Sequence, residues 1–300
     1  MASPSLAQLH AFVAVASTGS FNAAADVLGT TQPAVSQQIK ALEQGLDLRL
    51  FTRQRTGAFL TPEGRTLLPH AEAAVRAAES LNAEAAAFKS GLQQVRIAAI
   101  PTLAPYLLPD VIAELQLQRP ELKLSVSELR TSDLVSAVQS GQVDLGLLAA
   151  PTAPPQLAMA LVGKDEFLLA VGRRHPLAAS QSARLSDLAS EDLLLLEEGH
   201  CLRDQALQVC QMAGAGRTRD VRAVGLATLC QMVAAGQGVT LLPRSAARVE
   251  ASGARGVVAL PLKGAKNLHR DIAFVWRQES VHAADLSALV AAIREHLPLS

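Results

Sequence analysis

The spacing of hydrophobic residues changes near residue 90, and this change constrains the fold more strongly than any other feature of the sequence. Before residue 90, apolar side chains recur mostly at the three- and four-residue intervals of helices. After it, short apolar runs alternate with helical segments, the pattern of a parallel β-sheet covered by helices. The chain is therefore expected to be an α/β protein with a separate N-terminal part.

Three helices are predicted at the N-terminus, over residues 5–18, 21–28 and 32–44. Ser20 can cap the second helix, and Pro33 lies in the first turn of the third, where a missing N–H breaks no hydrogen bond. A short turn that contains glycine joins these two helices, as in a helix-turn-helix. The third helix has a polar face, although any exposed helix face is polar.

A basic segment follows the third helix. Two short strands are predicted at residues 48–51 and 58–60, and residues 49–65 hold four arginines against Glu63 alone. The 27 basic and 27 acidic residues of the whole chain balance, but a DNA-binding protein needs only one local basic surface. This basic wing indicates that the polar face of the third helix binds DNA. The residues expected to contact DNA are Gln32, Pro33, Ser36, Gln37, Lys40, Arg53 and Arg55.

A long helix is predicted to begin at Thr61-Pro62-Glu63, which supplies a capping residue, a first-turn proline and a carboxylate. It can continue to about Ser90 and carries an apolar stripe within an alanine-rich sequence. A solitary helix cannot bury such a stripe within one small domain. We therefore expect a homodimer through residues 62–90, the alternative being a simple connector.

The remainder of the chain alternates strands with helices and predicts two α/β lobes with a cleft between them, where ligands favour binding. Strands are expected at residues 95–101, 123–128, 144–149, 166–171, 192–197, 220–223, 239–242 and 270–276. Helices are expected at residues 106–118, 132–140, 226–235 and 283–296, with another that begins near residue 202. The pair His269-Arg270 is expected at the surface or in a connector.

Domain boundaries follow from these patterns. The expected domains are a DNA-binding domain at 1–61, a linker helix at 62–90 and an effector domain at 91–300. Within the effector domain, lobe I is expected at about 91–163 and 269–300, and lobe II at about 164–268.

The segment GHCLRDQALQVC, residues 199–210, concentrates the chemistry of the chain. Cys201 is expected where a strand gives way to a helix, and the positive end of a helix dipole stabilises a thiolate. His200 and Arg203 are candidate cations beside it, while Asp204 either opposes them or orients Arg203. A thiolate reacts with a peroxide to give a sulfenic acid, with which a second cysteine can condense.

The spacing of Cys201 and Cys210 creates a geometric conflict. If the intervening residues are helical, nine steps put the two Cα atoms roughly 13 Å apart and on opposite faces. A disulfide needs Cα atoms within about 7 Å, so part of the helix must reorder before the bond can form. The alternative is two unrelated helix cysteines. Cys230 lies among apolar residues and is expected to be a buried, inert thiol, the alternative being a second resolving partner that competes with Cys210.

The N-terminal sequence AAADVLGTTQPAVSQQIKALEQGLDLRLFTR, followed by LTPEG, resembles the LysR-type transcriptional regulators. This resemblance implies a winged helix-turn-helix, a dimerising linker helix and a homotetramer with two DNA-binding pairs. It also implies a two-lobed effector domain like the periplasmic binding proteins.

The effector sequences LLEEGHCLRDQALQVC, AAIPTLAPYLLPDVI and MVAAGQGVTLLP resemble the peroxide-sensing members of that family. The resemblance implies that Cys201 is the peroxidatic cysteine and Cys210 the resolving one. It further implies a hydrogen peroxide pocket formed by Thr102, Thr131, His200, Arg203 and Asp204, although each threonine could equally cap a helix. The chain departs from these relatives at Asp220, where they often have histidine, and at Val224 and Gly225, where they have hydroxyl residues.

The sequence thus predicts a regulator that binds double-stranded promoter DNA, works with RNA polymerase and senses hydrogen peroxide. One alternative is a LysR-type regulator that binds a small organic ligand between the lobes and has inert cysteines. Another is a thiol peroxidase. No cofactor is expected, and the seven histidines show no metal-ligand spacing with the cysteines. No signal peptide or membrane-spanning segment is recognised, so the expected location is the cytoplasm.

Overall fold

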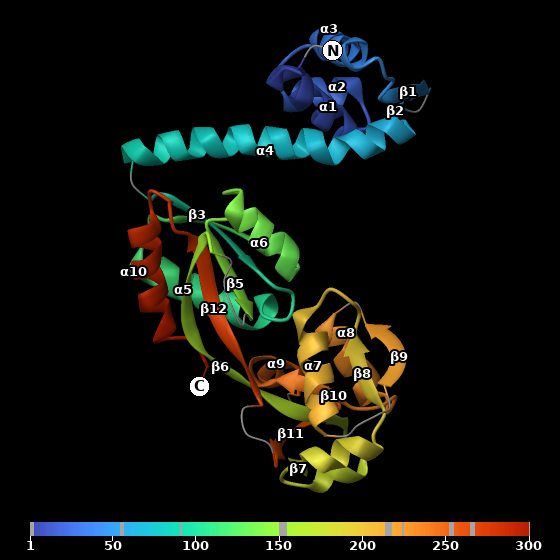
Figure 1. Cartoon of the computed structure of the whole chain (residues 1–300), viewed down its shortest axis with the longest axis vertical. Coiled ribbons are helices and arrows are strands. Elements are labelled where there is room, and N and C mark those ends of the chain that lie inside the picture. Colours follow the sequence, from blue (N-terminus) through green and yellow to red (C-terminus); the bar gives the residue numbers. More distant parts are fainter. Residues whose placement is uncertain are drawn as a thin grey trace. The chain divides into compact units, whose positions relative to one another are not determined.

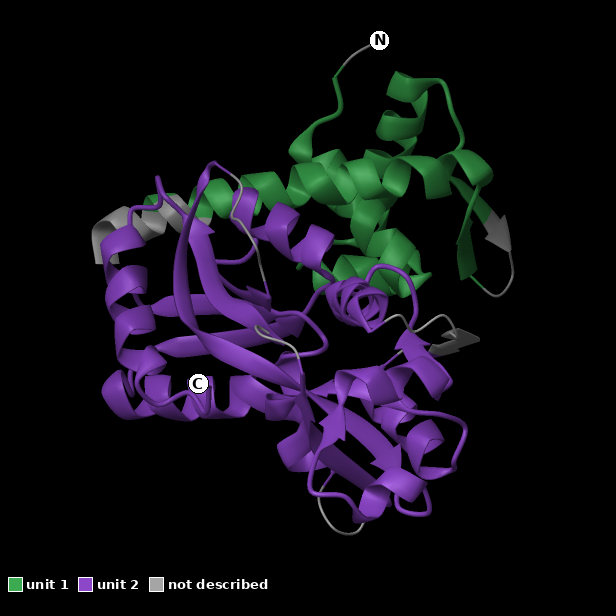
Figure 2. Ribbon diagram, turned by 60° about the horizontal axis from the view of Figure 1, so that its bottom comes forward, with its two compact units in different colours: residues 1–86 green, residues 87–300 purple. Residues whose placement is uncertain are grey.

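The computed structural model describes residues 3–54, 57–90, 92–149, 155–213, 218–223, 225–251, 255–264 and 268–299. The chain forms two compact units, residues 1–86 and 87–300, which are coloured separately in Figure 2. Of the helices in these described ranges, none is long and apolar enough to cross a membrane.

The N-terminal unit is a winged helix-turn-helix, as predicted. Its elements are α1 (Leu6–Thr18), α2 (Phe21–Val27), α3 (Gln32–Leu46), β1 (Phe51–Gln54), β2 (Gly57–Leu60) and α4 (Pro62–Ser90). Ser20 caps α2 by accepting from the backbone N–H of Ala23. Phe12, Val15 and Ile39 are buried in the core shared by the first three helices, and β1 pairs antiparallel with β2 to form the wing.

The start of α4 is fixed by side-chain and backbone contacts. The Thr61 hydroxyl accepts from the N–H of Gly64 at 3.0 Å and donates to the carbonyl of Arg49 at 2.7 Å. A Cβ at Gly64 would lie 2.3 Å from the Leu50 carbonyl oxygen, so only glycine permits this close approach. Farther along the helix, Ala71 and Val75 are buried while Leu81 is 71% exposed. Part of the apolar stripe on α4 is therefore uncovered.

The first half of the effector unit is a sheet covered by helices. Its elements are β3 (Gln94–Ala99), α5 (Ala104–Gln118), β4 (Lys123–Glu128), α6 (Thr131–Gln139), β5 (Leu145–Ala149), β12 (His269–Arg277) and α10 (Ala283–Arg294). β3 pairs in parallel with both β4 and β5. β12, however, pairs antiparallel with β5.

The second half begins on the strand β6 (Leu157–Gly172), which pairs antiparallel with β12 along most of that strand (Figure 1). It continues through η1 (Pro176–Ala179), β7 (Ala183–Arg184), η2 (Leu185–Ser190), β8 (Leu193–Leu196), α7 (Cys201–Met212), β9 (Thr218–Ala223), α8 (Leu226–Ala234), β10 (Thr240–Pro243), α9 (Arg244–Glu250) and β11 (Val257–Lys263). The elements α9 and β11 were not predicted from the sequence.

The main sheet is mixed, which corrects the expectation of a parallel sheet. Its strand order is β4-β3-β5-β12-β6-β11-β7, with β10 also paired to β6. The chain returns through β6 and β12 in opposite directions, so these strands pair antiparallel with their neighbours. Alternation of strands and helices predicts parallel crossovers, but it does not reveal strands that return in the opposite direction.

Two hydrophobic cores define what we call the first and second lobes. Val162 on β6 belongs to the first core, together with residues of β3, β5, β12 and α10. Phe167, five residues farther along the same strand, belongs to the second core with residues of β8, α7 and α8. β6 and β12 therefore run side by side where the two lobes meet (Figure 1).

Candidate functional site

A small pocket lies where the two lobes meet. Its lining residues are Ile100, Pro101, Thr102, Arg130, Thr131, Gly199, His200 and Cys201. Thr102 follows β3 and Thr131 begins α6, which follows β4. These residues come from the carboxyl ends of two parallel strands of the first lobe, and Cys201 comes from the second. Of the residues predicted for a peroxide pocket, the structure brings Thr102, Thr131, His200 and Cys201 together.

Cys201 is the first residue of α7, and His200 is the residue that precedes the helix. The Cys201 side chain is partly buried and contacts the hydrophobic core of the first lobe, although α7 packs in the second. Backbone N–H groups of a first helical turn point beyond the helix and carry partial positive charge. The sulfur therefore stands at the positive end of a helix, beside both lobes.

Gly199 gives the turn before α7 its shape. Its φ is +93°, in the region that favours glycine, and a Cβ there would lie 3.1 Å from Nη1 of Arg130. Glycine therefore allows both this backbone turn and the approach of the guanidinium.

His200 is buried, and its surroundings favour the neutral imidazole over the cation. Burial is the main cause that lowers its pKa below the ordinary 6.5, and the positive charge of Arg130 lowers it further. The negative charge of Glu197 acts in the opposite direction and raises the pKa. Its Nε2 has no hydrogen-bond partner among the described residues and lies 3.9 Å from Oε1 of Glu197. The sequence had suggested His200 as a cation beside Cys201. In the structure its imidazole can instead offer a hydrogen bond to a small polar molecule.

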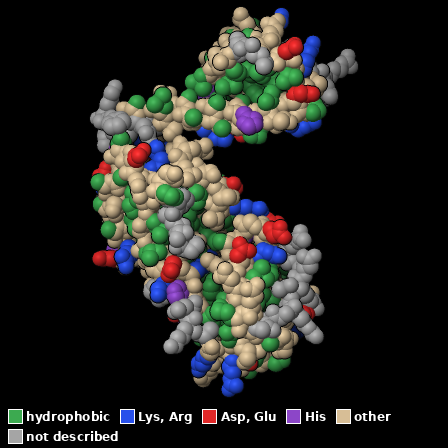
Figure 3. Space-filling view, viewed as in Figure 1, with side chains coloured by type: hydrophobic (Ala, Val, Ile, Leu, Met, Phe, Trp, Pro, Cys, Tyr) green, Lys and Arg blue, Asp and Glu red, His purple; other side chains and the backbone are tan. Residues whose placement is uncertain are grey.

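Arg130 supplies a positive charge at this pocket. It precedes α6 in the first lobe, and its Nη2 pairs with Oε1 of Glu197, which follows β8 in the second lobe. On the face shown in Figure 3, basic and acidic side chains lie next to one another at the end of the second lobe that faces the first. Arg130 was not predicted as a pocket residue. The only signal for it in the sequence is that it precedes Thr131, which was predicted.

Arg203 and Asp204 lie outside the residues that line the pocket. The Arg203 guanidinium donates to the carbonyl of Leu196 at 2.9 Å, which ties α7 to the end of β8. Asp204 is exposed in the first turn of α7. The structure therefore places neither charged group against the pocket.

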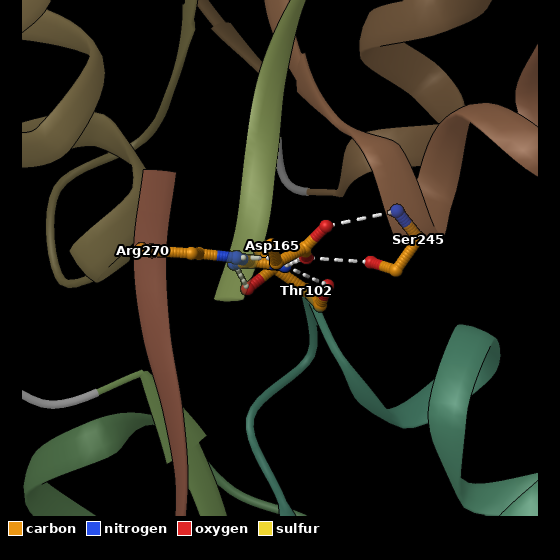
Figure 4. Close-up of polar contacts among 4 residues, drawn as sticks. All are labelled: Thr102, Asp165, Ser245 and Arg270. Atoms are coloured by element: carbon orange, nitrogen blue, oxygen red, sulfur yellow. Dashed lines mark hydrogen bonds and ion pairs between the residues drawn. The ribbon is translucent and has the colours of Figure 1, made fainter. Parts of the chain in front are cut away.

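Thr102 is held by a buried arginine (Figure 4). Nη1 of Arg270 donates to Oγ1 of Thr102 at 3.0 Å, and Nη2 donates to the Thr102 carbonyl at 3.1 Å. Arg270 in turn forms an ion pair with Asp165 at 2.9 Å. The expectation that Arg270 lies at the surface is wrong, because the Asp165 carboxylate compensates its buried charge. Since Oγ1 accepts from the guanidinium, the hydroxyl hydrogen of Thr102 is free to donate elsewhere.

Cys210 and Cys230 are shielded from solvent. Burial raises the pKa of Cys210 to about 11, and burial together with the charge of Glu250 raises that of Cys230 to about 12. Cys201 and Cys210 are both free thiols on one uninterrupted helix, so their Cα atoms are roughly 13 Å apart along its axis. The predicted geometric conflict is present in this structure.

Of the departures noted in the sequence, Asp220 lies on β9 and Gly225 precedes α8. Val224 and the side chain of Asp220 lie outside the described residues.

The face of α3 predicted to contact DNA is partly open. Pro33, Gln37 and Lys40 are exposed at spacings of four and three residues, so they share one face. Gln32 donates through Nε2 to Oγ of Ser36 at 2.8 Å, and both are half-buried. Arg53 lies on β1, but its side chain and the whole of Arg55 lie outside the described residues.

Comparison with known proteins places both units in one family. Residues 6–65 match the family described as "Bacterial regulatory helix-turn-helix protein, lysR family", and residues 90–298 match "LysR substrate binding domain". A "Probable hydrogen peroxide-inducible genes activator" of Mycobacterium avium is 43% identical over 279 residues, which are 92% of this chain and 89% of the relative.

Two further comparisons cover nearly the whole chain. The "DNA-binding transcriptional dual regulator OxyR" of Escherichia coli K12 is 36% identical over 290 residues, which are 96% of this chain and 94% of the relative. A hydrogen-peroxide-bound cysteine variant of OxyR from Corynebacterium glutamicum superimposes with a TM-score of 0.65 at 32% identity, covering 98% of this chain and 93% of that one.

Proposed function

The chain belongs to the LysR family of transcriptional regulators, and from its similarity to hydrogen peroxide-inducible activators we propose that it senses hydrogen peroxide through oxidation of Cys201 and a disulfide with Cys210. As a regulator of this family it is a DNA-binding protein and not an enzyme, so the thiol peroxidase alternative is set aside.

The observation that carries the proposal is the enclosure of Cys201 with hydroxyl and imidazole groups in one small pocket. Thr102, Thr131 and His200 surround it with groups that donate and accept hydrogen bonds, as a peroxide requires. A similar OxyR, as a cysteine variant, has hydrogen peroxide bound, which supports a peroxide over an organic metabolite.

The first step of the proposed reaction is oxidation of the Cys201 sulfur by two electrons. The thiolate sulfur attacks one peroxide oxygen, an S–O bond forms and the O–O bond breaks. The other oxygen leaves as hydroxide and takes up a proton to become water. The hydroxyl hydrogen of Thr102, free of Arg270, can donate to the departing oxygen. Cys201 is left as a sulfenic acid.

The second step joins the two cysteines. The Cys210 sulfur attacks the sulfenic sulfur, an S–S bond forms, and the S–O bond breaks with release of water. Because the two Cα atoms start roughly 13 Å apart, α7 must first unwind in part. Burial and a pKa near 11 keep Cys210 unreactive until that happens. Disulfide formation therefore requires a change in the second lobe, and that change is the proposed signal.

The remaining partners belong to the same proposal. The open face of α3, with the basic wing, contacts double-stranded promoter DNA. The uncovered part of α4 around Leu81 joins a second copy into a homodimer, and two such pairs make the tetramer that contacts RNA polymerase. The disulfide acts by changing how the effector domains meet within that assembly.

Peptide mass spectrometry after treatment with limiting hydrogen peroxide tests the proposal. We expect a Cys201–Cys210 disulfide in the wild type, sulfenic acid at Cys201 in Cys210→Ser, and no oxidation in Cys201→Ser. Cys230→Ala is the matched control, because that thiol is buried in α8, and it should behave as the wild type. Unmodified Cys201 in the wild type would overturn the proposal.

A further inference from the structure

Four buried polar side chains form one continuous set of contacts behind the pocket (Figure 4). Ser245 is the second residue of α9, which follows β10 directly. Asp165 lies on β6, Arg270 lies on β12, and Thr102 follows β3. Each of these four residues is at most 2% exposed. They come from α9, β6, β12 and the turn after β3, and β6 and β12 are the strands that run between the lobes.

Ser245 and Arg270 together fix the Asp165 carboxylate. The N–H of Ser245 donates to Oδ1 at 2.9 Å, and its hydroxyl donates to Oδ2 at 2.7 Å. Arg270 donates to the same Oδ2 from Nε at 3.2 Å and from Nη2 at 2.9 Å. Both carboxylate oxygens are therefore bonded, and the carboxyl plane cannot turn without breaking a buried hydrogen bond.

The fixed carboxylate determines where the guanidinium points. With Nε and Nη2 held by Asp165, the planar guanidinium presents Nη1 to Oγ1 of Thr102 and Nη2 to its carbonyl. Thr102 thus receives two bonds from one rigid group. A contribution to stability is a weak explanation for the Asp165–Arg270 pair, because a buried ion pair is often no more stabilising than well-packed apolar residues.

We propose that Asp165 and Ser245 are positioning residues for the reaction of Cys201 with peroxide. They hold Arg270 so that its guanidinium donates a hydrogen bond to Oγ1 of Thr102. The hydroxyl hydrogen of Thr102 then remains available to donate a hydrogen bond into the pocket. The inference rests on the proposed function and adds to it a contribution from α9 of the second lobe.

In the reaction, Thr102 donates to the peroxide oxygen that leaves when the O–O bond breaks. The sulfur gains the other oxygen, and the leaving hydroxide takes up a proton to become water. No group of the network is oxidised, and none changes its covalent bonds. A turned carboxylate would release Arg270 and let the Thr102 hydroxyl rotate, which misplaces this donor.

The test compares two rates for the Cys201 thiol in the full-length reduced protein. One is its second-order oxidation by hydrogen peroxide, and the other is its alkylation by iodoacetamide, both followed by quenching and peptide mass spectrometry. In Ser245→Ala we expect roughly tenfold slower oxidation, and in Asp165→Asn a loss of about 10- to 100-fold. Alkylation should stay within about twofold of the wild type, because it needs no hydroxyl donor in the pocket.

Two further variants sharpen the test. Ser245→Thr keeps a hydroxyl and should restore most of the oxidation rate. Thr240→Val removes an equally buried hydroxyl that donates to the Leu194 carbonyl at 2.9 Å outside the network, and it should oxidise as the wild type. If Asp165→Asn does not fold, the comparison of Ser245→Ala with Ser245→Thr still decides the matter.

The outcomes separate this inference from the proposed function. Wild-type oxidation rates in Ser245→Ala would overturn the positioning role while leaving peroxide sensing intact. Equal losses of oxidation and alkylation would also overturn it, since they indicate a general disturbance of the site. A wild-type Cys201 that hydrogen peroxide does not oxidise would overturn the proposed function itself.

Discussion

At the residue scale, the three cysteines have distinct surroundings that suit different roles. Cys201 is partly exposed at the start of α7, whereas Cys210 and Cys230 lie in the core of the second lobe. Burial raises the pKa of the latter two to about 11 and about 12, so they remain protonated thiols near neutral pH. Only a thiolate is strongly nucleophilic, so reactivity in the reduced protein should concentrate at Cys201.

Alkylation of the reduced, folded protein tests this difference. With iodoacetamide near pH 8, we expect Cys201 to be labelled well before Cys210 and Cys230. Labelling of Cys210 should rise about tenfold for each pH unit up to about 11, because its thiolate fraction rises in that proportion. Peptide mass spectrometry across a pH series measures the three rates. Comparable labelling of all three at pH 8 would contradict the burial described here.

The raised pKa of Cys210 also affects the stability of the folded protein. The ordinary thiol pKa is 9.0, and in the folded protein that of Cys210 is about 11. Between these values the unfolded chain loses the proton and the folded chain keeps it. The free energy of unfolding is therefore expected to decrease as the pH rises from about 9 to about 11.

At the element scale, α7 is both the support of the pocket and the obstacle to the disulfide. Its first residue, Cys201, contacts the first lobe, while Ala206, Val209 and Cys210 are buried in the second. The Arg203 guanidinium also ties the helix to the end of β8. Moving Cys210 toward Cys201 must break helical hydrogen bonds and expose part of this apolar face.

Hydrogen exchange of α7 tests this conflict. We expect amide exchange in residues 201–212 to accelerate at least about tenfold in the oxidised wild type, since unwinding removes protecting hydrogen bonds. The Cys210→Ser variant treated with peroxide serves as control and should keep slow exchange, because it stops at the sulfenic acid. Unchanged protection in a protein with a verified disulfide would refute the proposed switch.

At the scale of the whole molecule, the two units carry different tasks along one chain. The N-terminal unit has an exposed polar face on α3 and a long helix with an uncovered apolar segment. The effector unit has the pocket and the cysteines. In the proposed function, a signal that begins at Cys201 must pass from the effector unit to the N-terminal unit, and a change in how copies of the chain meet is the proposed route.

DNA binding should depend on Lys40 as a phosphate contact. For Lys40→Ala we expect weaker binding to all DNA sequences and a slope of log affinity against log salt that is less steep by about one. Fluorescence anisotropy at several salt concentrations measures both. Lys123→Ala, which removes an exposed lysine from β4 of the effector unit, is the matched control. Loss of preference at one base with an unchanged slope would assign Lys40 a base contact instead.

The exposed apolar segment of α4 should contribute to dimerisation. Leu81 is 71% exposed, so Leu81→Glu places a charge on the surface without disturbing a buried core. We expect the dimer to weaken at least about tenfold, because the new carboxylate would lose its hydration in the interface. Analytical ultracentrifugation measures this, with Leu117→Glu on α5 as the control at a residue that is 78% exposed. An unchanged dimer would assign that segment of α4 to the connector alternative.

Local sequence determined most elements of this protein. The helix-turn-helix, the wing and the start of α4 follow from periodicity, caps and a first-turn proline, all of which act within a few residues. The position of Cys201 at a helix start follows from the same kind of signal. The helix α9 was missed because it has only seven residues, and the strand β11 was missed because Pro261 interrupts its strand pattern.

Only the tertiary structure decided how the pocket is built. Arg130 meets Glu197 across 67 residues, Asp165 meets Arg270 across 105, and Arg270 meets Thr102 across 168. Hydrophobic periodicity states which face of an element is buried, but it does not state which distant charge will compensate a buried one. The sequence therefore suggested a surface position for Arg270 and a charged His200. The fold instead buries both, pairing the arginine with Asp165 and lowering the pKa of the imidazole.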